Sequence, residues 1–147
     1  VEKFAGHGTT RVALAQGAGM LRVIAGEFDG HRGPARTFTP INVWDLRLTA
    51  GATARLTMPE GHTAAVVPMH GGVTVNGERE AGEAQLVSFE REGGEFTIGS
   101  SAEATVLVLG GEPLNERVVG HGPFVMTSEH EIAQAIRDFR AGRFGRL

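Results

Sequence analysis

Histidines are the residues of this sequence best suited to metal chemistry, and His62 is the first to consider. Octahedral iron or manganese is held by several nitrogen and oxygen ligands. Few such ligands lie near His62 in the sequence, because Ala64 stands two residues on and Pro68 and Met69 follow in place of a carboxylate. Residues 95–109 contain no histidine. His62 is therefore a weak candidate for a metal ligand, and the alternative is a turn histidine that precedes a strand.

The other histidines lack the spacing of metal ligands. His7, His31 and His121 each neighbour a glycine in an expected loop, and His130 lies in the first turn of an expected helix. We interpret all four as loop or surface residues. A composite site drawn from His7, His31 and His121 stays open as an alternative, because loops that are distant in sequence can converge.

Other catalytic groups have little support. The chain has no cysteine, which excludes disulfides, zinc-thiolate sites and thiol nucleophiles. Ser100 and Ser101 lie in a glycine-rich turn that lacks the pattern of a nucleophile elbow. Glu112 and Glu116 are four residues apart in a segment with no helix to align them as an acid and base pair. We expect these two glutamates to accept hydrogen bonds from the backbone instead, and we predict no catalytic residue in this chain.

Composition limits the class of protein. The chain has 147 residues, 41% of them hydrophobic, and a net charge of -3 without a run of Lys or Arg. We therefore expect one domain over residues 1–147, with no binding of nucleic acid through charge and no membrane anchor. No signal peptide opens the sequence, so we expect a cytoplasmic protein. Because the chain begins with Val1, we also expect that it is a piece of a longer protein.

The elements that would position these residues are mostly strands. Residues 43–48 and 53–58 alternate between apolar and polar side chains, and the Ala50-Gly51 turn between them predicts a hairpin. Asn76-Gly77 is a second hairpin signal, of type I′. Eight to ten short strands, at spacings of about 8 to 12 residues, predict an all-β antiparallel sandwich or barrel of the jelly-roll kind. We place an opening segment at about 1–19, the barrel at 20–109 and a connector at 110–127.

One helix is expected at the C-terminal end, over residues 128–141. Ser128 and Glu131 form a capping box, in which each side chain can satisfy a backbone N–H at the helix start. Apolar residues then recur at helical spacing and make one stripe: Ile132, Ala135, Ile136 and Phe139.

The connector before this helix carries a large apolar load in Pro123, Phe124, Val125 and Met126. Surface loops seldom carry such a load without covering something. One interpretation is that these residues plug the end of the chain's own barrel. The other is that they and the helix residues Ile132, Ile136 and Phe139 form a surface for another domain or for a second copy of the chain.

The C-terminal third resembles the pirin family. The block GGEPLNERVVGHGPFVMTSEHEIAQAIRDFRAGRFG is similar to the family's GGEPL stretch, its GPFVMNT stretch and its EI-x-QA helix with a following G-x-F-G, in that order. Upstream, VIAGE at residues 23–27 is similar to the opening of the pirin C-terminal domain, and HGGVTVNG at 70–77 to a cupin hairpin. The resemblance runs from about residue 21 to residue 145. Thr127 departs from it, since the family usually has Asn there.

This resemblance implies a cupin domain that is one half of a two-cupin protein. In the family, the N-terminal cupin binds iron or another divalent metal, several members are quercetin 2,3-dioxygenases, and others are redox-sensitive regulators that bind protein partners. The chain resembles only the C-terminal half, so no cofactor is expected in this domain.

Two functions follow as hypotheses. The first is a non-catalytic C-terminal cupin domain that packs against the metal-bearing domain or, without it, self-associates, with further protein partners open. The second is a stand-alone small-molecule enzyme or binder that uses the barrel interior. The second needs inward-facing polar groups, whereas the expected strand faces are mostly Val, Leu, Ile, Phe and Met.

Overall fold

The structure is a computed structural model, and it describes residues 10–145. The chain divides into two compact units, Val1–Pro113 and Leu114–Leu147. Each unit is described by itself below.

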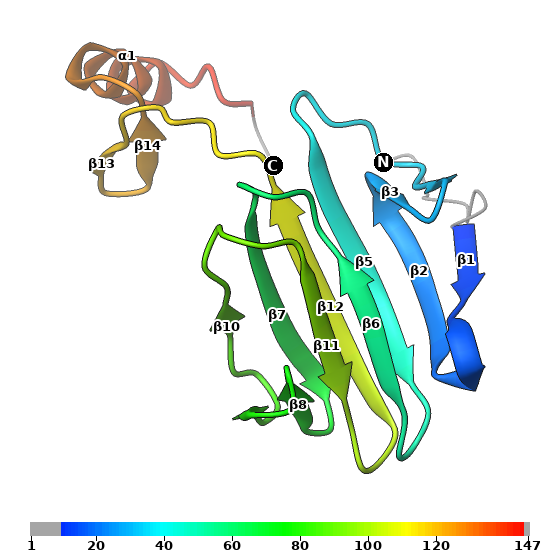
Figure 1. Cartoon of the computed structure of the whole chain (residues 1–147). Coiled ribbons are helices and arrows are strands. Elements are labelled where there is room, and N and C mark those ends of the chain that lie inside the picture. Colours follow the sequence, from blue (N-terminus) through cyan, green and yellow to red (C-terminus); the bar gives the residue numbers. More distant parts are fainter. Residues whose placement is uncertain (1–9, 146–147) are drawn as a thin grey trace. The chain divides into compact units, whose positions relative to one another are not determined.

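The first unit is a sandwich of two antiparallel sheets (Figure 1). The six-stranded sheet has the order β1-β2-β5-β12-β7-β10, and the four-stranded sheet has the order β6-β11-β8-β9. The strands of the larger sheet are β1 (Thr10–Ala13), β2 (Gly19–Ala25), β5 (Ile41–Leu48), β7 (Thr63–His70), β10 (Val87–Ser88) and β12 (Ala104–Gly111). Those of the smaller sheet are β6 (Thr53–Thr57), β8 (Val73–Val75), β9 (Arg79–Ala81) and β11 (Glu95–Gly99). The 3₁₀ turn Ala15–Gly17 and the hairpin of β3 (Glu27–Phe28) and β4 (His31–Arg32) complete the unit. The predicted all-β fold is confirmed.

Alternation along the strands determines which side chains form the core. Leu21, Trp44, Leu46, Val106 and Ile98 are almost fully buried and belong to one cluster that draws on both sheets. Their neighbours in sequence point to the opposite face of each sheet, because side chains alternate along a strand. This leaves the larger sheet with a second face, which is described below with the candidate sites.

The predicted hairpin of residues 43–48 with 53–58 is wrong. β5 pairs with β2 and β12, whereas β6 pairs with β11 in the other sheet. The turn at Ala50-Gly51 therefore carries the chain from one sheet to the other. Alternation showed correctly which residues face the core, but it contains no information about which strand is the neighbour.

The hairpin at Asn76-Gly77 is confirmed. β8 pairs with β9, and the φ angles of Asn76 and Gly77 are +52° and +72°. The shorter β3–β4 hairpin turns in the same way at Asp29 and Gly30, with φ of +46° and +74°. Positive φ at both central residues is the signature of the type I′ turn, which favours Asn or Asp followed by Gly.

The second unit is a small hairpin covered by a helix. β13 (Val119–His121) pairs with β14 (Phe124–Met126), and α1 (Glu129–Arg140) packs against both strands. Residues 119–126 were expected to be an irregular part of a connector, and they form strands instead. Gly122, with φ of +54°, and Pro123 make the two-residue turn, which has the positive first φ of a type II′ hairpin. Val119, Ile132 and Ala135 are buried in this unit.

Candidate functional site

A cavity of about 1100 Å³ opens in the first unit beside the β3–β4 hairpin. A volume at the upper end of the usual range for ligand pockets could take a small organic molecule. The cavity is lined by the hairpin, the loop that follows it, the start of β5 and the end of β6. Its side chains include Glu27, Phe28, Asp29, Arg32, Arg36, Asn42, Trp44, Arg55 and His62.

Trp44 and Phe28 form the aromatic part of the lining. Their ring centroids are 5.1 Å apart at an interplanar angle of 69°, an edge-to-face contact. Trp44 is 1% exposed, and its Nε1 has no hydrogen-bond partner among the described residues. A buried indole N–H usually finds an acceptor, so this buried donor is an exception among the described residues.

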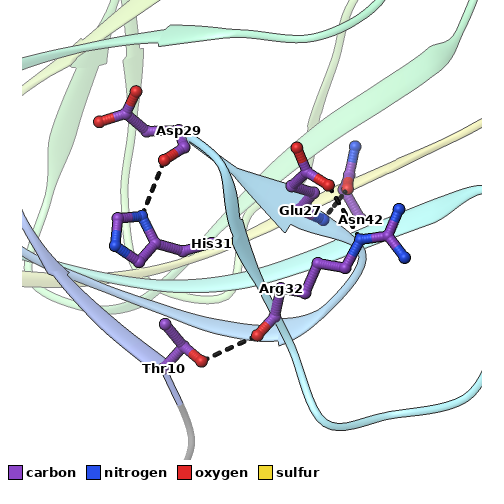
Figure 2. Close-up of polar contacts among 6 residues, drawn as sticks. All are labelled: Thr10, Glu27, Asp29, His31, Arg32 and Asn42. Carbon is purple, nitrogen blue, oxygen red and sulfur yellow. Dashed lines mark hydrogen bonds and ion pairs between the residues drawn. The ribbon is translucent and has the colours of Figure 1, made fainter.

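Polar contacts hold the hairpin at the rim of the cavity (Figure 2). Arg32 Nε donates to Glu27 Oε2 at 3.0 Å, and the Glu27 N–H donates to Asn42 Oδ1 at 3.0 Å. Gly26, with φ of +74°, lets the chain pass Asn42 closely, since a Cβ there would lie 2.0 Å from Asn42 Oδ1. His31 Nδ1 donates to the backbone carbonyl of Asp29 at 2.8 Å.

His62 also lines the cavity, but it does not bring a metal-ligand set with it. Its backbone N–H donates to the Pro59 carbonyl at 3.2 Å, and its Nδ1 is buried without a hydrogen-bond partner among the described residues. Glu27, a carboxylate of the same cavity, is paired with Arg32. Within residues 10–145, no group of three or more His, Cys, Asp or Glu is arranged to hold a metal ion. The donors present in this part of the chain do not fit an octahedral iron site.

The remaining candidates for chemistry are distributed over both units of the chain. His121 and His130 belong to the second unit, and both are exposed, while His7 lies outside the described residues. The composite site of His7, His31 and His121 stays a prediction. Ser100 is buried, and its hydroxyl donates to the Gly72 carbonyl at 2.7 Å. Glu112 and Glu116 are exposed, and neither side chain makes a hydrogen bond within the described part of the chain.

The helix start in the second unit is held by a compact polar cluster. Ser128 Oγ accepts a hydrogen bond from the Glu131 N–H at 3.3 Å. Glu131 Oε2 in turn accepts from the Thr127 N–H at 3.0 Å, from Thr127 Oγ1 at 2.6 Å and from Ser128 Oγ at 3.0 Å. The hydrogen bond from the Thr127 hydroxyl is the main cause that lowers the pKa of Glu131 below its ordinary value, and the one from Ser128 adds to it. The donor from residue 127 would be an amide if the usual Asn of the pirin family stood there.

The apolar residues expected to form a partner surface do not all face solvent. Ile132 is buried, and Phe124, Met126 and Ile136 are half-buried, whereas Pro123, Val125 and Phe139 are exposed. Phe124, Phe139 and Phe144 form an aromatic cluster with centroid distances of 6.1 to 6.3 Å. The second unit thus satisfies part of its apolar load internally and leaves exposed aromatic surface around this cluster.

A second apolar surface lies on the outer face of the six-stranded sheet, and it was not predicted from the sequence. Two rows of neighbouring side chains cross β5, β12 and β7 on the face away from the core. One row is Val43, Leu109 and Ala65, and the other is Asp45, Leu107 and Val67. Apart from Asp45, these residues are apolar and half-buried. We call the two rows the outer sheet face. The alternation of Val43–Leu48 was the available signal, because Val43 lies among the positions opposite the core.

Asp45 gives this face a charged edge on the side of β2. Its Oδ2 lies 2.7 Å from Arg22 Nη2 and 3.9 Å from Arg47 Nη2. Asp45 is 8% exposed, and its Oδ1 and the Nε of Arg22 are buried without partners among the described residues. Buried polar atoms usually have a hydrogen-bond partner, so these two atoms are exceptions among the described residues.

Comparison with solved structures shows the class of protein. The chain superposes on a crystal structure of quercetin 2,3-dioxygenase from Acinetobacter baumannii with a TM-score of 0.87 at 44% identity, over 93% of this chain and 48% of that one. It also matches a Cupin_2 domain of a transcriptional regulator from Enterobacter cloacae, with a TM-score of 0.52 at 20% identity, which shows the fold alone. The first unit is a cupin sandwich.

The family follows from the sequence. Residues 43–145 match the pirin C-terminal cupin domain, and the chain belongs to the pirin family. It is 47% identical, over 134 residues, to a Pseudomonas aeruginosa protein named "Putative quercetin 2,3-dioxygenase", and 32% identical, over 129 residues, to human pirin. The chain spans about half the length of these relatives, 46% and 44% respectively. None of the helices in residues 10–145 is long and apolar enough to cross a membrane.

Proposed function

We propose that this chain is the C-terminal cupin domain of a two-domain, pirin-like protein, and that it supports a metal-bearing N-terminal domain without reacting itself. The observation that carries the proposal is the coverage of the P. aeruginosa relative. That protein matches 91% of this chain at 47% identity, yet the chain spans only 46% of it. The names of the relatives point to quercetin 2,3-dioxygenase chemistry for the whole protein.

The small number of possible metal ligands in the cavity supports a non-catalytic role for this half of the protein. Oxygenation of a flavonol by a cupin needs a metal ion held by several nitrogen and oxygen ligands. His62 is the one imidazole of the cavity lining, and of the two carboxylates there, Glu27 and Asp29, the first is paired with Arg32. A single imidazole does not hold a catalytic metal against water.

The outer sheet face supports a docking role. Its apolar rows are continuous across β5, β12 and β7, and the Arg22–Asp45 pair leaves a donor and an acceptor without partners among the described residues at its β2 edge. We propose that the N-terminal half of the protein covers this face. The exposed aromatic surface around Phe139 is a second contact of the same kind, and self-association of the chain without its other half follows from either surface.

Elemental analysis together with a turnover assay tests the proposal. The purified chain is offered iron, manganese and nickel in turn, desalted, and assayed for metal content and for quercetin oxygenation. We expect less than a stoichiometric amount of each metal and no turnover. About one tightly bound metal ion per chain, with quercetin turnover, would instead establish the stand-alone enzyme.

A variant makes the result specific. His62→Ala removes the one histidine of the cavity, and His130→Ala, in the second unit, serves as the matched control. If the chain does take up a metal ion and only His62→Ala abolishes the uptake, this domain has a metal centre and the proposal is wrong.

A further inference from the structure

β6 is a free edge of the four-stranded sheet. It pairs with β11 over five residue pairs without a register shift, and no described strand pairs with its other side (Figure 1). The other edge strands of the two sheets are shorter, since β1 has four residues, β9 has three and β10 has two. Within residues 10–145, β6 is therefore the longest regular edge of either sheet.

The hydrogen bonds to β11 show which backbone groups of β6 are already used. The Met58 N–H donates to the Gly94 carbonyl at 2.7 Å, and the Ser100 N–H donates to the Ala52 carbonyl at 3.1 Å. Hydrogen-bonded pairs alternate with non-hydrogen-bonded pairs along an antiparallel ladder. Every second residue from Ala52 to Met58 therefore bonds to the β11 side.

The intervening residues direct their backbone groups to the free edge. These residues are Thr53, Arg55 and Thr57, and their N–H and C=O groups have no hydrogen-bond partner in the described part of the chain. Side chains do not block this edge, because β6 contains no proline and no bulge. Such a row of unpaired donors and acceptors is a template for another strand.

The cavity of about 1100 Å³ lies beside the same edge. Arg55 and Thr57 belong to its lining, and Phe28, Ile41 and Pro59 add apolar surface to it. When an extended peptide adds to a sheet edge, main-chain hydrogen bonds supply affinity and neighbouring pockets take alternate side chains. The β6 edge has both features.

We propose that β6 binds an extended peptide segment of a partner protein, which adds as a strand to the smaller sheet and places an apolar side chain in the cavity. A second copy of the chain fits this edge less well. If two β6 strands paired about a two-fold axis in the register that uses all three edge residues, Arg55 would lie opposite itself, and like charges directly opposite each other are destabilising. A peptide with an acidic residue near Arg55 has the complementary charge.

The site is independent of the domain-docking proposal, because the outer sheet face belongs to the larger sheet. A peptide with the sequence of residues 94–100 is a suitable probe, since this segment contains β11, the strand that β6 accepts on its other side. Its Phe96 and Ile98 alternate with Glu95 and Thr97, so one face is apolar and the other is polar. The control peptide carries Thr97→Pro and Ile98→Pro. Alternate N–H groups of a strand point to opposite edges, so one N–H is lost from the edge that faces β6 in either orientation.

Amide hydrogen exchange of the full chain, measured residue by residue by NMR, gives a direct assay. In the free chain, we expect the edge amides of Thr53, Arg55 and Thr57 to exchange quickly, and those of Ala54 and Leu56 to be protected by β11. With saturating probe peptide, exchange of the edge amides should slow by about tenfold or more. Binding should saturate below about 1 mM for the probe peptide and not for the control peptide.

Two variants of Arg55 separate backbone from side-chain recognition. Arg55→Pro removes one edge N–H and leaves the ladder with β11 intact, so it should weaken binding of the probe peptide by about tenfold or more. Arg55→Ala keeps the N–H and is the matched control, with a smaller expected effect. Urea unfolding of both variants verifies that they fold.

Four results would overturn the proposal. The edge amides could already exchange slowly in the free chain, or the probe peptide could leave their exchange unchanged. Arg55→Pro and Arg55→Ala could weaken binding equally. Finally, protection that appears without peptide as the protein concentration rises would assign the edge to a second copy of the chain.

Discussion

Replacing Asp45 by Asn tests the ion pair at the β2 edge of the outer sheet face. The change keeps the size of the side chain and removes its charge, so Arg22 loses the carboxylate that lies 2.7 Å away and Arg47 loses one at 3.9 Å. The cost depends on how far water screens the pair. The side chain of Asp45 is 11% exposed and that of Arg22 is 37% exposed.

These exposed fractions place the free-energy cost of breaking the ion pair between two limits. Breaking a fully buried pair costs roughly 3–5 kcal/mol, whereas exposed pairs are worth about 0.2–1 kcal/mol. Because more than a third of Arg22 is in contact with solvent, we discount the buried value and expect Asp45→Asn to lower the free energy of unfolding by about 1–3 kcal/mol. A double-mutant cycle with Arg22→Gln should give a coupling energy of about 1 kcal/mol or more.

Urea unfolding followed by Trp44 fluorescence measures this loss, and it reports on the first unit because the chain has no other tryptophan. Glu95→Gln is the control, since it breaks the Arg55–Glu95 pair, whose side chains are 68% and 55% exposed. We expect the control to cost less than about 1 kcal/mol. Equal costs for Asp45→Asn and Glu95→Gln, or a coupling energy of zero in the cycle, would refute the reasoning about the buried pair.

Two further predictions concern a turn and the helix start. Gly26→Ala should destabilise the first unit by about 1 kcal/mol or more beyond Gly30→Ala, because both positions have φ of +74° but a Cβ at Gly26 would also lie 2.3 Å from the Ile41 carbonyl. Equal losses in the same unfolding assay would show that the close approach is relieved at no cost. Because the pKa of Glu131 is lowered, its carboxylate stabilises the folded state at pH values above its ordinary pKa of 4.5. This contribution is lost as the pH falls through the pKa of the folded state. An NMR pH titration of α1 should therefore lose an acid-dependent step in Glu131→Gln and keep it in Glu129→Gln, and loss of the step in both variants would contradict this assignment.

Local chemistry made parts of the structure predictable from the sequence. Asn76-Gly77 determined a turn because few residue pairs accept two positive φ angles. Ser128 and Glu131 marked a helix start because their side chains reach nearby backbone N–H groups. In both cases the interacting groups lie within four residues of each other, so the sequence contains the whole interaction.

Contacts between residues that are far apart in the sequence could not be predicted in this way. The partner of β5 depends on the packing of the complete sandwich, and alternation in Val43–Leu48 is the same for any neighbour. The cavity brings residues 26–62 together, and the unsatisfied N–H of Trp44 becomes visible only once its surroundings are known. Trp44 reads in the sequence as one more core residue. The outer sheet face was missed for a similar reason, since its rows belong to three strands that are far apart in the chain.

Co-purification with the other half of the relative tests the central claim, that this domain docks through its outer sheet face. The chain is co-expressed with the tagged N-terminal half of the P. aeruginosa relative, and the molar ratio of the two is measured after affinity capture and gel filtration. We predict a one-to-one complex that is lost with Leu107→Arg and kept with Thr53→Arg, an exposed position on the other sheet. Two soluble halves that elute separately, or a complex that survives Leu107→Arg, would contradict the account.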